Sequence, residues 1–320
     1  MKRIAFVFPG QGSQKVGMGR DLYHNHRVGK EVFENIDSSL NEKLSDLIFH
    51  GEEKELQLTQ NTQPALLAVS MAIVKIIEFE LKKKTNEFVE VVLGHSLGEY
   101  SALCSINCVS QKVAAKLLRI RGKAMQSAVS NLETSMVAVI GMELEQIEKE
   151  ISQIENTSNN VCEIANDNCP GQVILSGTKD SVELVSKKLK LLGARSIIDL
   201  KVSAPFHCTL MKNATRIMRD ALKDVNIKEP KIKFINNVNA SFVSNPSDIK
   251  SLLIKQVESR VRWRESIHKA STLNLDFIIE IGHGKVLTGL NKRINVNAEY
   301  FNISTLDDIN KFLESYGDKL

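Results

Sequence analysis

The sequence predicts an α/β protein in which a large domain is interrupted by a small subdomain. Short apolar runs of strand length alternate with amphipathic helical stretches along most of the 320 residues. One of these runs ends in a G-x-S-x-G turn that opens a helix. Between residues 130 and 202 the order changes to β-α-β-β-α-β, the split βαβ pattern of ferredoxin-like folds. We therefore expect a discontinuous large domain, residues 1–129 and 203–320, and a ferredoxin-like subdomain, residues 130–202.

The composition is that of an ordinary globular protein, with 42% hydrophobic and 25% charged residues. A net charge of +4 without interleaved aromatic and basic residues gives no indication of nucleic-acid binding. No apolar run has the length of a membrane span, and the N-terminus lacks the apolar segment of a signal peptide. The 5 cysteines are odd in number and form no C-x-x-C pair, which predicts reduced thiols and a cytoplasmic protein.

The first element expected is a buried strand over residues 4–8, followed by a glycine-rich turn at residues 9–14. The turn fits neither G-x-G-x-x-G nor the P-loop, so nucleotide binding is unsupported. A strand followed by such a turn is able to aim a main-chain N–H into a site, and a plain tight turn is an equally supported alternative. Residues 21–60 are predicted to be mostly helical, and Pro64 is then expected to open a long apolar helix that ends near Lys83.

The strongest signal lies between Val89 and Tyr100. An apolar run to Leu93 is followed by Gly94-His95-Ser96-Leu97-Gly98, which fits the nucleophile elbow of α/β-hydrolase-like folds. The two glycines permit the sharp turn, and residues 97–103 are predicted to be helical. Ser96 would then lie at a helix N-terminus, where free N–H groups favour a developing oxyanion. The alternative is a tight turn whose serine only caps the helix.

A second signal lies on the helix expected from the N-cap Ser110 to about Ser127. Arg121 falls on its apolar side, four residues from both Leu117 and Met125. A buried guanidinium needs a partner, so Arg121 indicates an internal salt bridge or an anionic ligand, and the pattern alone favours the salt bridge. Two stripes are expected along this helix, a solvated one of Lys112, Lys116, Arg119 and Lys123, and a buried one of Val113, Leu117, Ile120 and Ala124.

Within the subdomain the expected strands and helices occupy short, clearly bounded segments. The strands are 136–140, 161–166, 172–176 and 195–200, and the helices are 143–154 and 181–192. Beyond the subdomain, strands are expected at 232–238 and 276–281.

His207, after a strand and the turn Ser203-Ala204-Pro205-Phe206, is the histidine best placed to act as a base. His95 is the neighbour of Ser96, and strand alternation would point it the other way. His283 lies in a glycine turn, and the remaining histidines lie in polar helices, at His24, His26, His50 and His268.

Six short segments, in this order and over nearly the full length, resemble the malonyl-CoA:acyl-carrier-protein transacylases, the malonyl-loading enzymes of bacterial-type fatty acid synthesis. These segments are Phe8-Pro9-Gly10-Gln11-Gly12-Ser13-Gln14, Gly94-His95-Ser96-Leu97-Gly98-Glu99-Tyr100, Arg121-Gly122-Lys123, Pro205-Phe206-His207, Asn236-Asn237-Val238 and Gly284-Lys285-Val286-Leu287. In combination they are far more specific than any one of them.

The resemblance implies a role for each matching residue. Ser96 would be the acylated nucleophile and His207 its base, and Arg121 would hold the free carboxylate of the malonyl group. The oxyanion hole would use the main-chain N–H groups of Gln11 and Leu97. Gln256 falls where the family orients its histidine through a main-chain carbonyl.

The implied reaction is a ping-pong transfer from malonyl-CoA to Ser96 and then to the phosphopantetheine thiol of acyl carrier protein. It would use no metal or other cofactor and involve neither nucleic acid nor membrane. Phe206 is expected to favour malonyl over methylmalonyl, as phenylalanine does in the related polyketide acyltransferases. One departure is His283, where the family usually has proline, and we expect this exchange to be neutral.

Two other classes of protein remain as alternatives. An esterase or thioesterase of the α/β-hydrolase type would have an acid between serine and histidine and a histidine near the C-terminus. Asp199 is the only convenient acid, over a hundred residues follow His207, and Arg121 would have no role. A non-catalytic scaffold would predict a damaged site, whereas all the expected residues are present.

Overall fold

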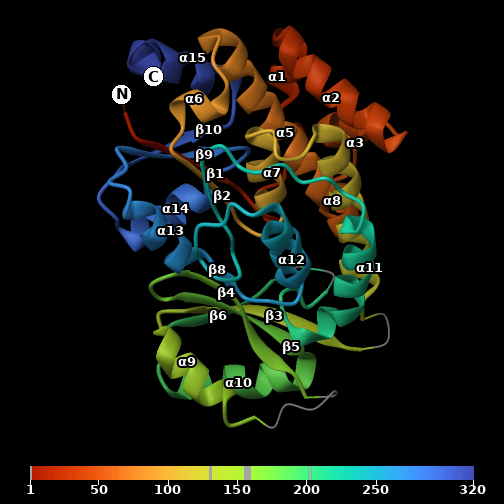
Figure 1. The fold of residues 1–320 in the computed structure, drawn as a ribbon. Coiled ribbons are helices and arrows are strands. Elements are labelled where there is room, and N and C mark those ends of the chain that lie inside the picture. Colours follow the sequence, from red (N-terminus) through yellow and green to blue (C-terminus); the bar gives the residue numbers. More distant parts are fainter. Residues whose placement is uncertain (1, 130–131, 155–159, 201, 203) are drawn as a thin grey trace.

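Two five-stranded sheets organise the chain in the computed structural model, which describes residues 2–129, 132–154, 160–200, 202 and 204–320 (Figure 1). The larger sheet has the order β10-β9-β1-β2-β7, and every neighbouring pair in it is parallel. Its strands are β1 (Ile4–Phe8), β2 (Val91–Gly94), β7 (Lys233–Ile235), β9 (Phe277–Ile281) and β10 (Glu299–Ile303). The strands predicted near residues 4–8, 89–93, 232–238 and 276–281 are therefore present.

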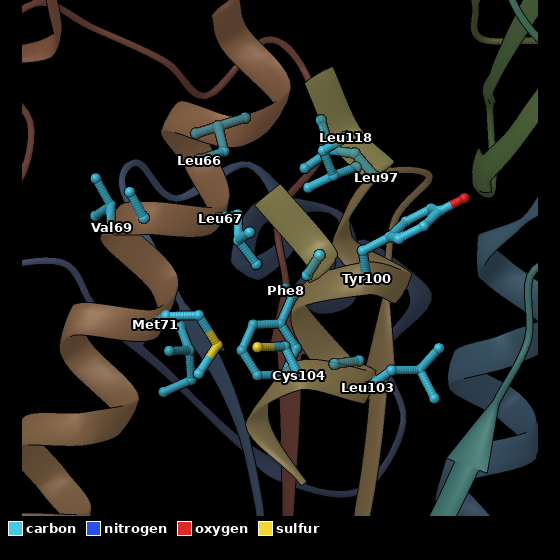
Figure 2. Packing of buried hydrophobic residues seen from close by; sticks show 14 of the residues in the cluster. Phe8, Leu66, Leu67, Val69, Met71, Leu97, Tyr100, Leu103, Cys104 and Leu118 are labelled. Carbon is cyan, nitrogen blue, oxygen red and sulfur yellow. The ribbon is translucent and has the colours of Figure 1, made fainter. Parts of the chain in front are cut away.

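Helices cover both faces of this sheet, which explains why its central strands are apolar throughout. On one face, the buried helix α5 (Thr59–Leu81) packs with α7 (Gly98–Ser105) and α8 (Gln111–Ser127). Figure 2 shows this core, in which Phe8 of β1 lies among side chains of α5 and α7. The other face is covered by α13 (Trp263–Ser271) and α14 (Val286–Ile294).

The remaining helices surround the large sheet or follow its strands (Figure 1). They are α1 (Arg20–Asn25), α2 (Arg27–Leu40), α3 (Leu44–His50), α4 (Glu53–Gln57), α6 (Thr85–Phe88), α11 (Lys212–Leu222), α12 (Pro246–Gln256) and α15 (Leu306–Tyr316), with short 3-10 turns at Thr209–Met211 and Gly317–Lys319. In the part of the chain that the structure describes, no helix combines the length and apolarity needed to traverse a bilayer.

The prediction that Pro64 opens the long helix was wrong, because α5 already begins at Thr59. A proline inside a helix removes the N–H that would bond the carbonyl four residues earlier, here that of Gln60. Arg119 of α8 supplies the missing donor, since its Nη1 lies 2.6 Å from the Gln60 oxygen. The helix continues through Pro64 because a neighbouring helix satisfies this carbonyl.

Helix α8 begins after Ser110, whose Oγ accepts a hydrogen bond from the Val113 N–H, and it ends at Ser127, as predicted. Its solvated and buried stripes were assigned wrongly at two positions. The Arg119 side chain is only 12% exposed and bonds Glu42, Asn61 and the start of α5. Ile120, expected to be buried, is 37% exposed. The turn before α3 and the start of α5 cover Arg119, whereas Lys112, Lys116 and Lys123 on the same stripe are exposed as predicted.

The smaller sheet has the order β6-β3-β5-β4-β8. Its strands are β3 (Thr134–Ile140), β4 (Cys162–Cys169), β5 (Gln172–Thr178), β6 (Ser196–Asp199) and β8 (Val261–Arg262), and its helices are α9 (Leu144–Ile151) and α10 (Lys179–Leu191). The first four strands are antiparallel and, with the two helices, form the expected ferredoxin-like arrangement.

Strand β8 was not predicted, and it lies beyond the stretch 130–202 while pairing with β4 in parallel. The small sheet thus includes a strand from the large part of the chain. The predicted boundaries at 129/130 and 202/203, and Ser203 itself, involve residues 130, 131, 201 and 203, which lie outside the described residues. These boundaries stay a prediction.

Candidate active site

Ser96 lies at a sharp turn between β2 and α7, with a left-handed φ of 53°. The turn is possible because the residues two positions before and after the serine, Gly94 and Gly98, are glycines. A Cβ at Gly94 would overlap the main chain of Gly98, and one at Gly98 would overlap the carbonyl of Phe8. Asn237 fastens the turn, since its Oδ1 accepts from the Ser96 N–H at 2.8 Å and its Nδ2 donates to the Gly94 carbonyl at 2.7 Å. Asn237 therefore fixes the main chain of the turn at two positions, one before the serine and one at the serine itself.

His207 is in hydrogen-bond contact with this serine. Its Nε2 lies 2.8 Å from Ser96 Oγ, and its Nδ1 lies 2.9 Å from the Gln256 carbonyl and 3.1 Å from the Ser259 carbonyl. Carbonyl oxygens only accept, so Nδ1 carries the proton and Nε2 is free to accept from the serine hydroxyl. Burial and the nearby Arg121 cation lower the pKa of His207 to about 3, which keeps the imidazole neutral.

Arg121 is 1% exposed and makes no ion pair with a carboxylate among the described residues. Its Nη1 donates to Gln63 Oε1 at 2.9 Å. Its Nη2 lies 2.8 Å from Gln256 Oε1 and 3.1 Å from Ser96 Oγ. The internal salt bridge that the sequence pattern favoured is thus not formed in this part of the chain. A guanidinium held by two neutral amides next to the serine retains its full charge for an anionic ligand.

Two main-chain N–H groups near Ser96 are unused. Within the described residues, neither the Gln11 nor the Leu97 N–H has a hydrogen-bond partner. Both residues line the same cavity as Ser96, Gln11 from the turn after β1 and Leu97 from the start of α7. Unpaired donors beside a nucleophile are the arrangement that stabilises a developing oxyanion.

The cavity around these groups has a volume of about 380 Å³ and lies between the large and small sheets. The turn after β1, the elbow and α8 form one side, and the strands of the small sheet form the other. Phe206, next to His207, and the apolar Met125, Met136 and Ile174 give it a largely apolar lining. A cavity with a few polar groups at one point is typical of a small-molecule site.

His95 differs from its expected placement. It follows the end of β2, so strand alternation does not apply to it, and its ring lines the same cavity as Ser96. Its Nε2 lies 3.0 Å from Asn168 Oδ1 and 3.3 Å from Asn166 Nδ2. Both asparagines come from the irregular part of β4, where two register shifts interrupt the pairing with β5. The small subdomain thus contributes polar groups to the cavity.

Five of the six residues singled out in the sequence line one cavity: Gln11, Ser96, Leu97, Arg121 and His207. Gln256 is fully buried behind them and contacts both Arg121 and His207. His283 is half-buried, and burial lowers its pKa.

Sequence reasoning missed four residues that hold the others: Gln63, Glu99, Asn237 and Ser259. Glu99 and Asn237 belong to two of the six segments that resemble the family, but nothing in their spacing indicated a contact with the elbow. Asp199, the acid that an esterase would need, is exposed on β6, and the described contacts of His207 include no carboxylate.

The sequence comparisons and the structure comparisons identify the same family of proteins. The family model described as acyl transferase domain matches residues 5–300. The malonyl CoA-acyl carrier protein transacylase of Bacillus subtilis is 42% identical over 309 residues, covering 97% of this chain and 96% of that protein. A protein of the same name from Staphylococcus aureus is 37% identical, covering 98% and 100%.

Among solved structures, the acyl-carrier-protein-S-malonyltransferase of Bartonella henselae superposes with a TM-score of 0.94 at 44% identity, covering 98% of this chain and 99% of that one. A malonyl-transacylase solved in complex with its type II polyketide synthase acyl-carrier protein has a TM-score of 0.92 at 34% identity, covering 98% and 99%. This chain belongs to the acyl transferase family and, within it, to the malonyl CoA-acyl carrier protein transacylases.

Proposed function

We propose that this chain transfers a malonyl group from malonyl-CoA to the phosphopantetheine thiol of acyl carrier protein, through a malonyl ester on Ser96. The observation that carries the proposal is the buried Arg121, whose Nη2 lies 3.1 Å from the Ser96 hydroxyl. An ester hydrolase has no use for a cation at that point, whereas a malonyl group brings a carboxylate to it. The names of the relatives supply the donor and the acceptor.

In the first half-reaction, His207 Nε2 removes the proton of Ser96 Oγ as the oxygen attacks the thioester carbonyl. The N–H groups of Gln11 and Leu97 stabilise the tetrahedral oxyanion. The carbon–sulfur bond then breaks, the proton passes from His207 to the CoA sulfur, and CoA leaves. The malonyl group remains as an ester on Ser96.

In the second half-reaction, His207 takes the proton of the carrier-protein thiol, and the sulfur attacks the ester. The same two N–H groups serve the second oxyanion, and the serine oxygen leaves with the proton from His207. Donor and acceptor use one site in turn, so the kinetics are ping-pong. No step requires a metal or another cofactor.

The cytoplasmic location expected from the sequence is part of this proposal. All five cysteines are buried free thiols, which suits a reducing compartment. Acyl carrier protein and malonyl-CoA would be the partners there.

The test is incubation with labelled malonyl-CoA, followed by peptide mass spectrometry and by addition of either acyl carrier protein or buffer. We expect label on Ser96, its rapid transfer to the carrier protein and its slow loss to water. Rapid loss to water in the absence of the carrier would instead identify an esterase or thioesterase. No label on the wild-type chain, or equal label on Ser96→Ala, would contradict the proposal.

A further inference from the structure

Glu99 is a buried acid that the proposed mechanism leaves without a role. It lies on the first turn of α7, three residues after Ser96, and is 1% exposed. Among the described residues it forms no ion pair with a lysine or arginine. A buried carboxylate without a basic partner is costly, so its hydrogen bonds must account for its position.

Both oxygens of Glu99 accept hydrogen bonds from residues of the site. Oε1 accepts from the main-chain N–H of Asn237, the residue that fastens the elbow. Oε2 accepts from Gln256 Nε2 at 2.6 Å. Burial raises the pKa of Glu99, whereas these two donors and the Arg121 charge favour its ionised form. Because both oxygens face N–H donors, the arrangement fits the carboxylate, which only accepts hydrogen bonds.

The orientation of the Gln256 amide follows from these contacts. Its nitrogen faces three acceptors: Glu99 Oε2, the Ser96 carbonyl at 2.9 Å and Asn237 Oδ1 at 3.4 Å. Its oxygen therefore faces the other way, toward Arg121 Nη2 at 2.8 Å. A reversed amide would place its N–H groups against the N–H groups of the guanidinium and its oxygen against these three oxygens. The Glu99 carboxylate is the nearest of them and the only charged one, so it contributes most to opposing reversal.

We infer that Glu99 is a specificity-determining positioning residue: through the Gln256 amide it holds Arg121 where the carboxylate of the acyl group binds. The inference rests on the proposed function, because it assigns to Arg121 the carboxylate of malonyl. Glu99 itself does not line the cavity, so its effect on the substrate passes through Gln256 and Arg121.

The informative variant is Glu99→Gln, which keeps the shape and removes the acceptor-only character. The Asn237 N–H would retain the new amide oxygen, so the new NH₂ group would face Gln256 Nε2. Gln256 would relieve this contact by turning its oxygen toward residue 99 and its NH₂ toward Arg121, at the cost of its hydrogen bond to the Ser96 carbonyl. The guanidinium would lose an acceptor and meet donors instead, and it would leave the position that binds the carboxylate.

The experiment measures acylation of Ser96 by malonyl-CoA and by acetyl-CoA for the wild type, Glu99→Gln, Glu99→Asp and Glu78→Gln. Glu78 is the matched control, since it is a buried glutamate that also accepts from a main-chain N–H, that of Thr85, but contacts none of the site residues. We expect Glu99→Gln to lower the malonyl-to-acetyl ratio of kcat/KM by about 10- to 100-fold, the range for a hydrogen bond to a charged group. Glu99→Asp, still acceptor-only, should keep more of the ratio, and Glu78→Gln should leave it unchanged.

Thermal unfolding of each variant separates specificity from folding. An unchanged ratio in a folded Glu99→Gln, or an equal loss with both acyl groups, would make Glu99 a structural residue and overturn the inference. If Glu99→Gln does not fold, Glu99→Asp decides, because a retained carboxylate on a shorter stem should still lower the ratio, though less. Failure of the proposed function is distinguishable, since the wild-type chain would then form no malonyl-serine.

Discussion

Replacing Arg121 by alanine removes the group that we expect to select malonyl. A carboxylate bound by two charged hydrogen bonds gains about 1.5–3 kcal/mol from each, or about 3–6 kcal/mol together. Losing both should slow acylation by malonyl-CoA by about 10²–10⁴-fold. Acetyl-CoA presents no carboxylate, so its transfer should not fall and should even improve. Arg121→Lys should recover little, because an ammonium lacks the planar fork.

Removal of Arg121 also leaves the side-chain oxygens of Gln63 and Gln256 without this donor. Each loss costs about 1–3 kcal/mol of stability, a cost that is the same for every acyl group. The ratio of malonyl to acetyl rates is therefore the correct measure, with folding checked by circular dichroism. Lys123→Ala is the control, since Lys123 is exposed on the same helix. Equal loss of both rates would show that Arg121 is structural.

The remaining predictions concern the nucleophile, its base, the cavity wall and helix packing. Ser96→Ala should abolish covalent malonylation without unfolding the chain, and His207→Ala should slow it by orders of magnitude, so a normal rate in His207→Ala would refute the base assignment. Because the pKa of His207 is lowered from 6.5 to about 3, acylation by the folded enzyme should stay nearly constant from about pH 8 to 5, and a rate that halves near pH 6.5 would contradict this. Between pH 6.5 and about 3 the unfolded chain binds a proton at His207 that the folded chain does not bind. The free energy of unfolding should therefore decrease as the pH falls through this range, which acid unfolding curves would test. The wild type should prefer malonyl over methylmalonyl by about 1–3 kcal/mol, the range for one methyl group in an apolar pocket, and Phe206→Ser should reduce this preference. Equal wild-type rates with both substrates would exclude Phe206 as the residue that selects against the methyl group. Arg119→Ala should lower the free energy of unfolding by about 1–3 kcal/mol, because the Gln60 carbonyl loses its donor, while the malonyl-to-acetyl ratio stays unchanged in kinetic assays.

The sequence was most informative where local chemistry decides the structure. A strand, two glycines and a serine determine the elbow, since only glycine fits at positions 94 and 98. Helical spacing correctly placed Arg121 inside. The same spacing failed for Arg119, because periodicity tells which residues share a face but not which element covers that face. Pro64 was misplaced for a related reason, since the donor that permits it within the helix comes from α8.

The contacts behind the site could not be predicted from spacing. Gln63, Glu99, Asn237 and Gln256 come from α5, α7, the loop after β7 and α12, which are distant in sequence. Each is an uncharged amide or a lone acid whose spacing indicates no contact with the others, and only the fold brings them together. Spacing alone also gave no partner for His207, because a main-chain carbonyl has no signature among residue types, and Gln256 was expected there only from the family resemblance.

In the described part of the chain, His207 is oriented by two main-chain carbonyls and not by a carboxylate, and this difference affects how readily the imidazole is protonated. In a Ser-His-Asp triad the acid stabilises the imidazolium that forms during attack. Here two neutral carbonyls orient His207, and the nearby Arg121 charge opposes its protonation. A malonyl carboxylate bound at Arg121 offsets that charge and makes the imidazolium less costly, whereas an acetyl group does not. Arg121 therefore binds the malonyl carboxylate and, when no carboxylate is bound, makes His207 a weaker base. For this reason, removing Arg121 should increase the rate of acetyl transfer.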